Sequence, residues 1–287
     1  MRSAQKASLS RNLFCSLLAA SLTSQGCATT VPYTGVGPHP QIERGAPNPI
    51  IDFLGNFLAL PSKLFLLSWK FDQHYISPET EDKLVHYLDQ RKQNPVLTNV
   101  KFRLNQYRPI QDLSRLIHNR HMAWPYRLLL GLPITLIIDV LLPGRLLPWG
   151  DYYNPYTNTA HLYSDHPAIM LHEAGHAYDF GKKKFKGTYA ILRLIPFVDL
   201  YQEYKATDQA FDYLIEIQDR ETEVRAIKIL YPAYATYIAG YLGYFGGLAV
   251  FFSHIYAQHE ADEREDFYQA LGYLLPPGTR TDLLPSH

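Results

Sequence analysis

His172-Glu173-Ala174-Gly175-His176 is the stretch that decides what this chain folds into. Asp165 as N-cap, Pro167 at the start and Gly181 as the stop predict a helix over Ala168 to Phe180 around it. Residues four apart lie on one helix face, so His172 and His176 can direct two imidazole nitrogens at one ion. Glu173 then points beside that ion, where it can take a proton from a metal-bound water. We expect one Zn2+ per chain, because imidazole and carboxylate ligands with an open position suit zinc.

Two histidines need a third protein ligand, and three glutamates compete for that role. The extended motif with a third histidine is absent, because Lys182 stands at that position. Glu203 falls on an apolar helical stripe, where an ionised carboxylate is costly unless it is paired or bound to metal. Glu221 and Glu260 have more charged neighbours and therefore more solvated surroundings. We favour Glu203, keep Glu221 as the alternative third ligand, and rank Glu260 last.

The chain before the motif predicts an α+β fold that is predominantly helical. A hairpin is expected where 149–153 and 157–163 flank Asn154-Pro155-Tyr156, and it would form a small edge sheet directly before the motif helix. The alternation over 100–107 predicts a further strand, and 77–90 and 110–119 read as helices. His161 and His166 lie close to the motif, where supporting positions suit them better than ligand positions.

The N-terminus predicts export. Residues 1–26 combine a basic start with a short apolar run, as in a signal peptide, and Gly26 precedes Cys27 as in a lipoprotein signal. Cys27 is therefore the candidate lipidation site, with an ordinary secretory signal as the alternative. Cleavage leaves Cys27 as the only cysteine, which excludes an internal disulfide. Ala28 favours the outer membrane over the inner one, so we expect a periplasm-facing lipoprotein of a bacterial cell envelope.

Three segments bear on membrane contact. Residues 27–49 are rich in proline and glycine and predict a flexible tether, followed by one domain over 50–287. The apolar start of that domain, 50–69, either covers the core or lies on a membrane surface. The apolar run over 128–142 predicts a buried core element. The uncharged 230–252 is long enough to span a bilayer, but proline and glycine dilute it, which favours a buried or interfacial hairpin.

The amino-acid composition limits the classes of molecule that this chain is expected to bind. Charged residues make up 19% of the 287 residues and the formal net charge is zero, which argues against nucleic acid as a partner. The 22 tyrosines are unusually many and point to amphipathic surfaces near membrane or substrate.

The chain resembles the gluzincin zinc metallopeptidases. The resemblance rests on the motif, on Glu203-Tyr204-Lys205-Ala206, which matches E-x-x-A, and on the lipidation-like signal. Within these metallopeptidases the chain is similar to the membrane-associated group of HtpX-like heat-shock proteases and periplasmic lipoprotein proteases. The resemblance implies a zincin-like metallopeptidase domain in which His172, His176 and Glu203 bind zinc and Glu173 is the general base. That group usually carries an aspartate after E-x-x-A that orients a ligand histidine. Here Thr207 takes that position, and the aspartate is displaced by one.

We therefore expect a zinc metalloendopeptidase that hydrolyses peptide bonds of envelope proteins or peptides. Zinc would polarise the scissile carbonyl, and Glu173 would take the proton of the attacking water and pass it to the leaving amine. A tyrosine or histidine should stabilise the oxyanion; the sequence does not identify it, and His254 and His259 are weak candidates. The alternative is a catalytically inactive zincin-fold lipoprotein that acts as an envelope assembly or binding module. A third possibility, an integral membrane protease, requires 230–252 to span the bilayer.

Overall fold

The structure, a computed structural model of the chain, describes residues 39–147 and 150–272. These residues form two compact units. The first unit holds the described chain up to His166 together with Ala177–Leu192, and the second holds Pro167–His176 and the described chain from Arg193. The expected signal peptide, Cys27 and the tether residues 28–38 lie outside the described residues.

The described chain is α+β, mostly helical with one small mixed sheet, as expected from the sequence. The sheet belongs to the first unit and has the strand order β1-β2-β4-β3. Its strands are β1 (Ile42–Arg44), β2 (Lys101–Leu104), β3 (Tyr152–Asn154) and β4 (Thr159–Leu162). β2 is parallel to both β1 and β4, and β3 pairs antiparallel with β4. The strand predicted over 100–107 and the hairpin before the motif helix are therefore confirmed.

The prediction of a flexible tether does not hold for its last residues, because β1 lies within them. Ile42–Arg44 contains neither proline nor glycine and aligns in register with Phe102 to Leu104 of β2. The amide of Phe102 donates to the carbonyl of Gln41 at 2.8 Å. In β1, backbone groups therefore form hydrogen bonds with β2, whereas the backbone of a flexible tether forms them with water.

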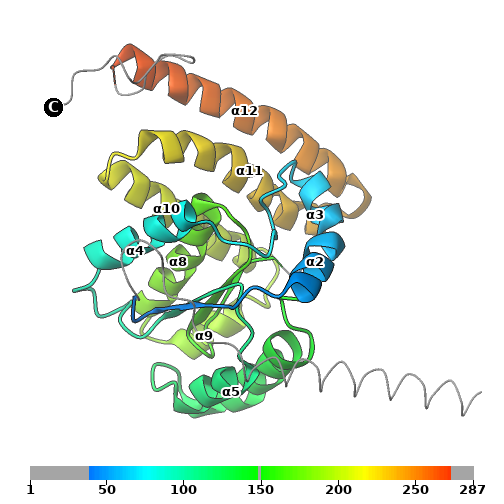
Figure 1. Cartoon of the computed structure of the whole chain (residues 1–287), viewed down its shortest axis with the longest axis vertical. Helices are drawn as coiled ribbons and strands as arrows, with labels where there is room; N and C mark the ends of the chain where they lie inside the picture. The colour runs from blue at the N-terminus through cyan, green and yellow to red at the C-terminus, as the bar shows by residue number, and fades with distance from the viewer. Residues whose placement is uncertain (1–38, 148–149, 273–287) are drawn as a thin grey trace, which may run out of the picture. The chain divides into compact units, whose positions relative to one another are not determined.

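In the part of the chain described, the first unit also contains nine helical segments, of which α2, α3, α4, α5 and α9 are labelled in Figure 1. The nine segments are α2 (Pro49–Leu58), α3 (Leu60–Phe65), α4 (Pro78–Gln90), α5 (Pro109–His118), α6 (Trp124–Tyr126), η2 (Arg127–Gly131), α7 (Leu132–Thr135), η3 (Leu136–Leu141) and α9 (Lys186–Leu192). The helices predicted over 77–90 and 110–119 are confirmed as α4 and α5. Ser77 caps α4, because its Oγ accepts from the amide of Thr80.

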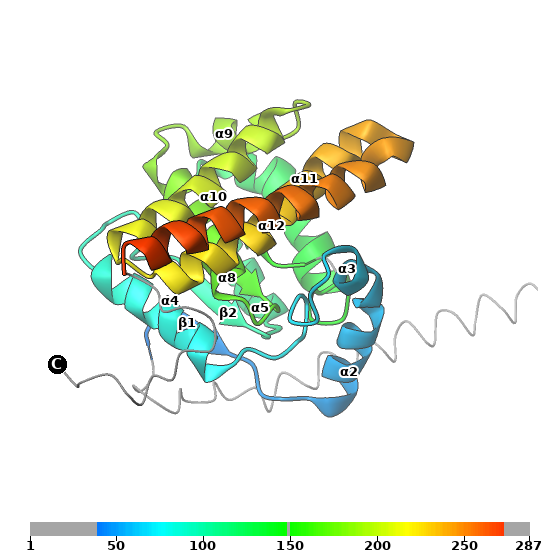
Figure 2. The ribbon, with the colours of Figure 1, turned by 90° about the horizontal axis from the view of Figure 1, so that it is seen from above.

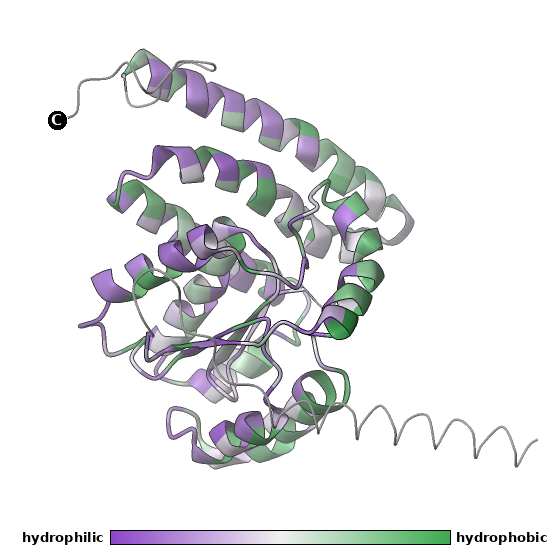
Figure 3. Ribbon diagram, in the orientation of Figure 1, coloured by the Kyte–Doolittle hydropathy of each residue, from purple (hydrophilic) through white to green (hydrophobic). Residues whose placement is uncertain are grey.

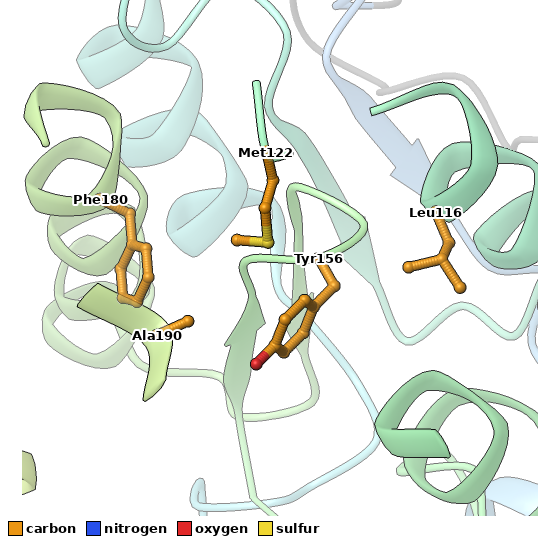
Figure 4. Close-up of a cluster of buried hydrophobic side chains, with 5 residues drawn as sticks. All are labelled: Leu116, Met122, Tyr156, Phe180 and Ala190. Atoms are coloured by element: carbon orange, nitrogen blue, oxygen red, sulfur yellow. The ribbon is translucent and has the colours of Figure 1, made fainter. Parts of the chain in front are cut away.

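One buried cluster of the first unit gathers side chains from segments far apart in the sequence (Figure 4). Leu116 comes from α5, Met122 from the loop after it, and Tyr156 from the turn between β3 and β4. Phe180, near the end of α8 (Pro167–Lys182), and Ala190 of α9 complete the cluster. It therefore fixes the end of the motif helix beside the hairpin that precedes it in sequence.

The prediction of a buried core element over 128–142 is wrong. Leu129, Ile137 and Leu141 are exposed, whereas the small or polar residues Thr135 and Asp139 are buried. The reason is polar: Asp139 accepts hydrogen bonds from Tyr152 Oη at 2.8 Å and Asn154 Nδ2 at 2.7 Å, which turns the apolar side outward.

In α2 and α3, as in residues 128–142, apolar side chains are exposed and a polar side chain is buried. Ile50, Phe53 and Phe57 of α2 are exposed, while Lys63 of α3 is buried and donates to the carbonyls of Trp69 and Phe71. The apolar character of α2 stands out in Figure 3. Residues 50–69 were expected either to cover the core or to lie on a membrane surface. These exposed side chains do not cover the core.

The second unit is built from long helices: α10 (Val198–Glu216), α11 (Arg220–Leu242) and α12 (Gly246–Ala270). α11 and α12 run side by side as a hairpin (Figures 1 and 2), joined by the short η4 (Gly243–Phe245). A buried cluster packs the two helices together in the halves that lie away from the turn. Its members are Val224, Ile227, Ala257, Ala261 and Tyr268.

The uncharged stretch 230–252 is therefore a hairpin and not one straight helix. Gly243 ends α11 with a φ of 55°, a left-handed conformation that glycine adopts readily. The prediction of a hairpin is confirmed, but its apolar end is exposed and not buried. By length and composition alone, Trp124–Leu141 and the stretch Arg220–Ala270 could cross a membrane.

Candidate metal centre

The motif lies on α8, as the sequence predicts, although the ends of the helix differ from expectation. The N-cap is His166 and not Asp165. Asp165 instead accepts hydrogen bonds from the amide and hydroxyl of Ser77, at 2.9 and 2.6 Å, which takes its carboxylate away from α8. Gly181 lies inside the helix, which continues to Lys182. Neither difference changes the register of the motif.

The two motif histidines face the same point from adjacent turns. The ring centroids of His172 and His176 are 4.7 Å apart and the rings are nearly perpendicular. Glu203 of α10 reaches the same point, because its Oε2 lies 3.0 Å from His172 Nε2 and 3.2 Å from His176 Nε2. Tetrahedral zinc with bonds of about 2.0–2.1 Å separates neighbouring ligand atoms by about 3.3 Å. The distance from Glu203 Oε2 to each imidazole nitrogen is thus close to the spacing between neighbouring zinc ligands.

A close helix contact brings Glu203 to the histidines. A Cβ atom on Gly175 would lie 2.5 Å from the carbonyl oxygen of Ala206 on α10. Only glycine at position 175 and small residues on the facing stripe of α10, such as the buried Ala206 and Ala210, permit this approach. The glycine inside the motif therefore sets the distance between the two helices that carry the site.

Glu203 is almost completely enclosed, with 1% of its surface exposed. Its second oxygen, Oε1, accepts a hydrogen bond from the Arg193 guanidinium, and the hydroxyl of Tyr237 on α11 also hydrogen-bonds to this carboxylate. Burial alone would raise the pKa of Glu203, but the interactions with His176 and His172 outweigh it and hold the pKa well below its ordinary value. The carboxylate is therefore ionised, with Oε2 directed at both imidazoles.

Thr207, which replaces the expected aspartate, lies next to the ring of His172. Thr207 Oγ1 lies 3.1 Å from His172 Nδ1, so the ring can donate from Nδ1 and present the Nε2 lone pair to the site. The displaced aspartate, Asp208, pairs instead with Lys205 at 2.9 Å. Thr207 thus stands where the resemblance expects an orienting aspartate, with its hydroxyl at hydrogen-bonding distance from the His172 ring.

The remaining motif residue, Glu173, is buried next to the two histidines. Its carboxylate and the imidazole nitrogens of His172 and His176 have ligand atoms within 4.8 Å of one another. The Glu173 carboxylate is therefore close enough to the two imidazoles to reach a water held at the same point.

The competing residues are engaged elsewhere. The side chain of Glu221 is 73% exposed and pairs with Arg225 at 3.1 Å. Glu260 lies on the charged half of α12 and hydrogen-bonds to Tyr256. His166 Nε2 lies 2.8 Å from Ser68 Oγ, in the first unit.

His161 belongs to a second buried cluster, with Asp112 and Asp139 in the first unit, whose ligand atoms also lie within 4.8 Å of one another. Protein groups already occupy these carboxylates: Arg103 pairs with Asp112, and Tyr152 and Asn154 donate to Asp139. Burial raises the pKa of Asp139 to about 7 and that of Asp112 to about 6. We therefore assign this cluster to the structural network of the first unit.

Two contacts of Glu203, Arg193 and Tyr237, were not identified from the sequence. A signal existed for Arg193, because it is the one charged residue between Lys186 and Asp199. A lone charge in an apolar stretch needs a partner, and Glu203 is the nearest buried acid in sequence. Tyr237 is one tyrosine among 22, so only the fold distinguishes it.

Comparison with protein-family models, curated proteins and solved structures gives no match for this chain. The function is therefore inferred from the geometry of the residues themselves.

Proposed function

We propose that this chain is a zinc-dependent metallopeptidase with a zincin-like catalytic centre. His172, His176 and Glu203 would hold the zinc ion, and Glu173 would serve as general base. The observation that carries the proposal is the position of Glu203 Oε2, 3.0 and 3.2 Å from the two imidazole nitrogens, although it lies on another helix. A chance occurrence of the motif gives no reason for a buried carboxylate at that point.

The protein residues divide the work of peptide hydrolysis. Bound zinc supplies a Lewis acid and lowers the pKa of a coordinated water toward neutrality. Glu173 takes the proton of that water and delivers it to the leaving amine. Thr207 holds His172 in the tautomer that a ligand needs, and Arg193 holds the far oxygen of Glu203 so that the near one stays in place.

Tyr237 is the hydroxyl that we assign to the oxyanion. Its ring is partly exposed, but desolvation of the hydroxyl, together with the charge of the nearby Glu203, raises its pKa well above the ordinary value. It is therefore protonated at neutral pH and can donate to an oxygen that gains charge beside the metal. His254 and His259 are not needed for this role; His259 pairs with Glu263 on the exposed part of α12.

The decisive experiment compares Glu173→Gln with wild type. We expect the variant to retain zinc, measured by elemental analysis, and to lose casein hydrolysis by at least about a hundredfold, the usual contribution of a general base. Glu221→Gln is the matched control, because that side chain is exposed, and it should leave both quantities unchanged. Equal hydrolysis by wild type and Glu173→Gln would reject the peptidase and favour the inactive binding module.

The cellular setting is also a proposal. The predicted signal peptide and Cys27 support a lipoprotein of the bacterial envelope that faces the periplasm and acts on proteins or peptides there. Labelling of Cys27 by radioactive palmitate, lost in Cys27→Ser, would test the anchor.

A further inference from the structure

Near its turn, the helical hairpin of the second unit buries few large apolar side chains and exposes many of them. Ala235, Gly246, Val250 and Ala257 are buried in this hairpin, and further from the turn Tyr231 stacks on Tyr256 between the arms. A Cβ atom on Gly246 would lie 2.5 Å from the carbonyl oxygen of Ala239, so the arms touch there through backbone. Hairpins in water bury their large apolar residues, whereas helices that pack in lipid meet through small ones.

The large apolar side chains of the same segment point outward. We define the hairpin end as residues 241–256. Its exposed large residues include Leu242, Phe245, Leu248, Phe251, Phe252 and Ile255. Phe197, also exposed, stacks on Tyr241 with ring centroids 4.6 Å apart and extends this surface onto the start of α10. A surface of this size is far more than the scattered apolar residues of a soluble protein.

A sharp boundary divides the hairpin into a charged and an uncharged half. Lys228 of α11 pairs with Asp262 of α12 at 3.4 Å, which shows that these residues lie at the same level. From Ile229 to His259 the chain contains no lysine, arginine, aspartate or glutamate, and beyond that level α12 becomes dense in charge (Figure 3). Each arm extends about 20 Å from the boundary to the turn, compared with about 15 Å for half the hydrocarbon core of a bilayer.

We propose that the hairpin end inserts into one leaflet of a phospholipid bilayer without crossing it. The uncharged arms have the length for one leaflet, and the turn at Gly243 reverses the chain before the opposite surface is reached. Tyrosines along both arms suit the interface between lipid and water. The convex shape of a hairpin tip also matches a fluid bilayer, whereas a protein partner would need a groove to receive it.

The same geometry specifies a substrate class, and this step rests on the proposed function. Tyr237 precedes Tyr241 by one helical turn and contacts Glu203, so the metal site lies at the level of the uncharged arms, on the side of α11 that faces α10. Polypeptide that reaches the site is then polypeptide at the membrane surface. The substrate class is the extended segment that an envelope protein exposes next to the lipid.

A depth measurement tests insertion on the full chain. Cys15→Ser and Cys27→Ser remove both native thiols and the lipid anchor, and Phe251→Cys then carries an environment-sensitive fluorophore. Phe267→Cys, exposed on the charged half of the same helix, is the control. With vesicles of phosphatidylethanolamine and phosphatidylglycerol, we expect a blue shift and quenching by nitroxide-labelled lipids at position 251 only. Phe245→Glu should abolish the shift.

Three outcomes would overturn the proposal. They are an unchanged signal at position 251, equal changes at positions 251 and 267, and a blue shift without vesicles that grows with protein concentration. The last would assign the hairpin end to contact with a second copy of the chain. The assay measures neither zinc nor hydrolysis, and Glu173→Gln should insert as wild type does, so failure of the peptidase proposal is distinguishable from failure of this one.

Discussion

Removing the Thr207 hydroxyl should weaken zinc binding by about tenfold. Thr207→Val keeps the shape of the side chain but deletes the Oγ1 atom that lies 3.1 Å from His172 Nδ1. Partners that orient a ligand histidine are worth about 10–100-fold in metal affinity. The lower end applies here, because a neutral hydroxyl is a weaker acceptor than a carboxylate and the side chain of His172 is 12% exposed, so water can replace it. Tenfold corresponds to about 1.4 kcal/mol.

Competition with a chromophoric zinc chelator at pH 7 would measure the change. Thr207→Ser should restore most of the affinity, because it returns the hydroxyl. Asp208→Asn should have no effect, since the carboxylate of Asp208 is engaged with Lys205. Zinc affinity in Thr207→Val equal to wild type, or an equal loss in Asp208→Asn, would refute the orienting role of Thr207.

Further perturbations test the site and the fold separately. Glu203→Ala should abolish stoichiometric zinc while Glu221→Ala keeps it, by elemental analysis; the reverse result would move the third ligand. Gly175→Ala should lower the free energy of unfolding by about 1–3 kcal/mol and weaken zinc binding, because its Cβ meets the Ala206 carbonyl; unchanged thermal unfolding would contradict the close helix contact. Burial lowers the pKa of His74 to about 4, so between pH 4 and 6.5 only the unfolded state binds its proton. Wild type should therefore gain about 3 kcal/mol over His74→Gln as pH rises through that range. Urea unfolding followed by tryptophan fluorescence reports on this first unit, and a constant difference between the two proteins would exclude the effect.

The local features of the site were predictable from the sequence. Spacing places His172 and His176 on one helix face, and the cost of burying a charge singles out Glu203 among three glutamates. Arg193 and Tyr237 were not predictable, because they reach Glu203 from other segments of the second unit. Helix periodicity describes neighbours along one element, and such contacts depend on how elements pack.

The apolar segments show where pattern reading failed. An apolar run such as 128–142 predicts burial if water is the only alternative to the core. In this chain the polar groups have inward partners: Asp139 with Tyr152 and Asn154, and Lys63 with backbone carbonyls. Hydropathy counts apolar residues but does not tell which side of a helix has polar partners. The direction of the apolar face could therefore be read only from the fold.

The ion pair between Arg193 and Glu203 has a consequence for the order of assembly. A buried carboxylate between two imidazoles would normally need a cation before the helices could close around it. Here the chain brings its own cation, and Arg193 occupies Oε1 while Oε2 still faces the histidines. If the chain binds zinc as we propose, its folding does not have to wait for the metal. The proposed envelope protein could then be exported unfolded, fold in its compartment, and acquire zinc as the last event of its maturation.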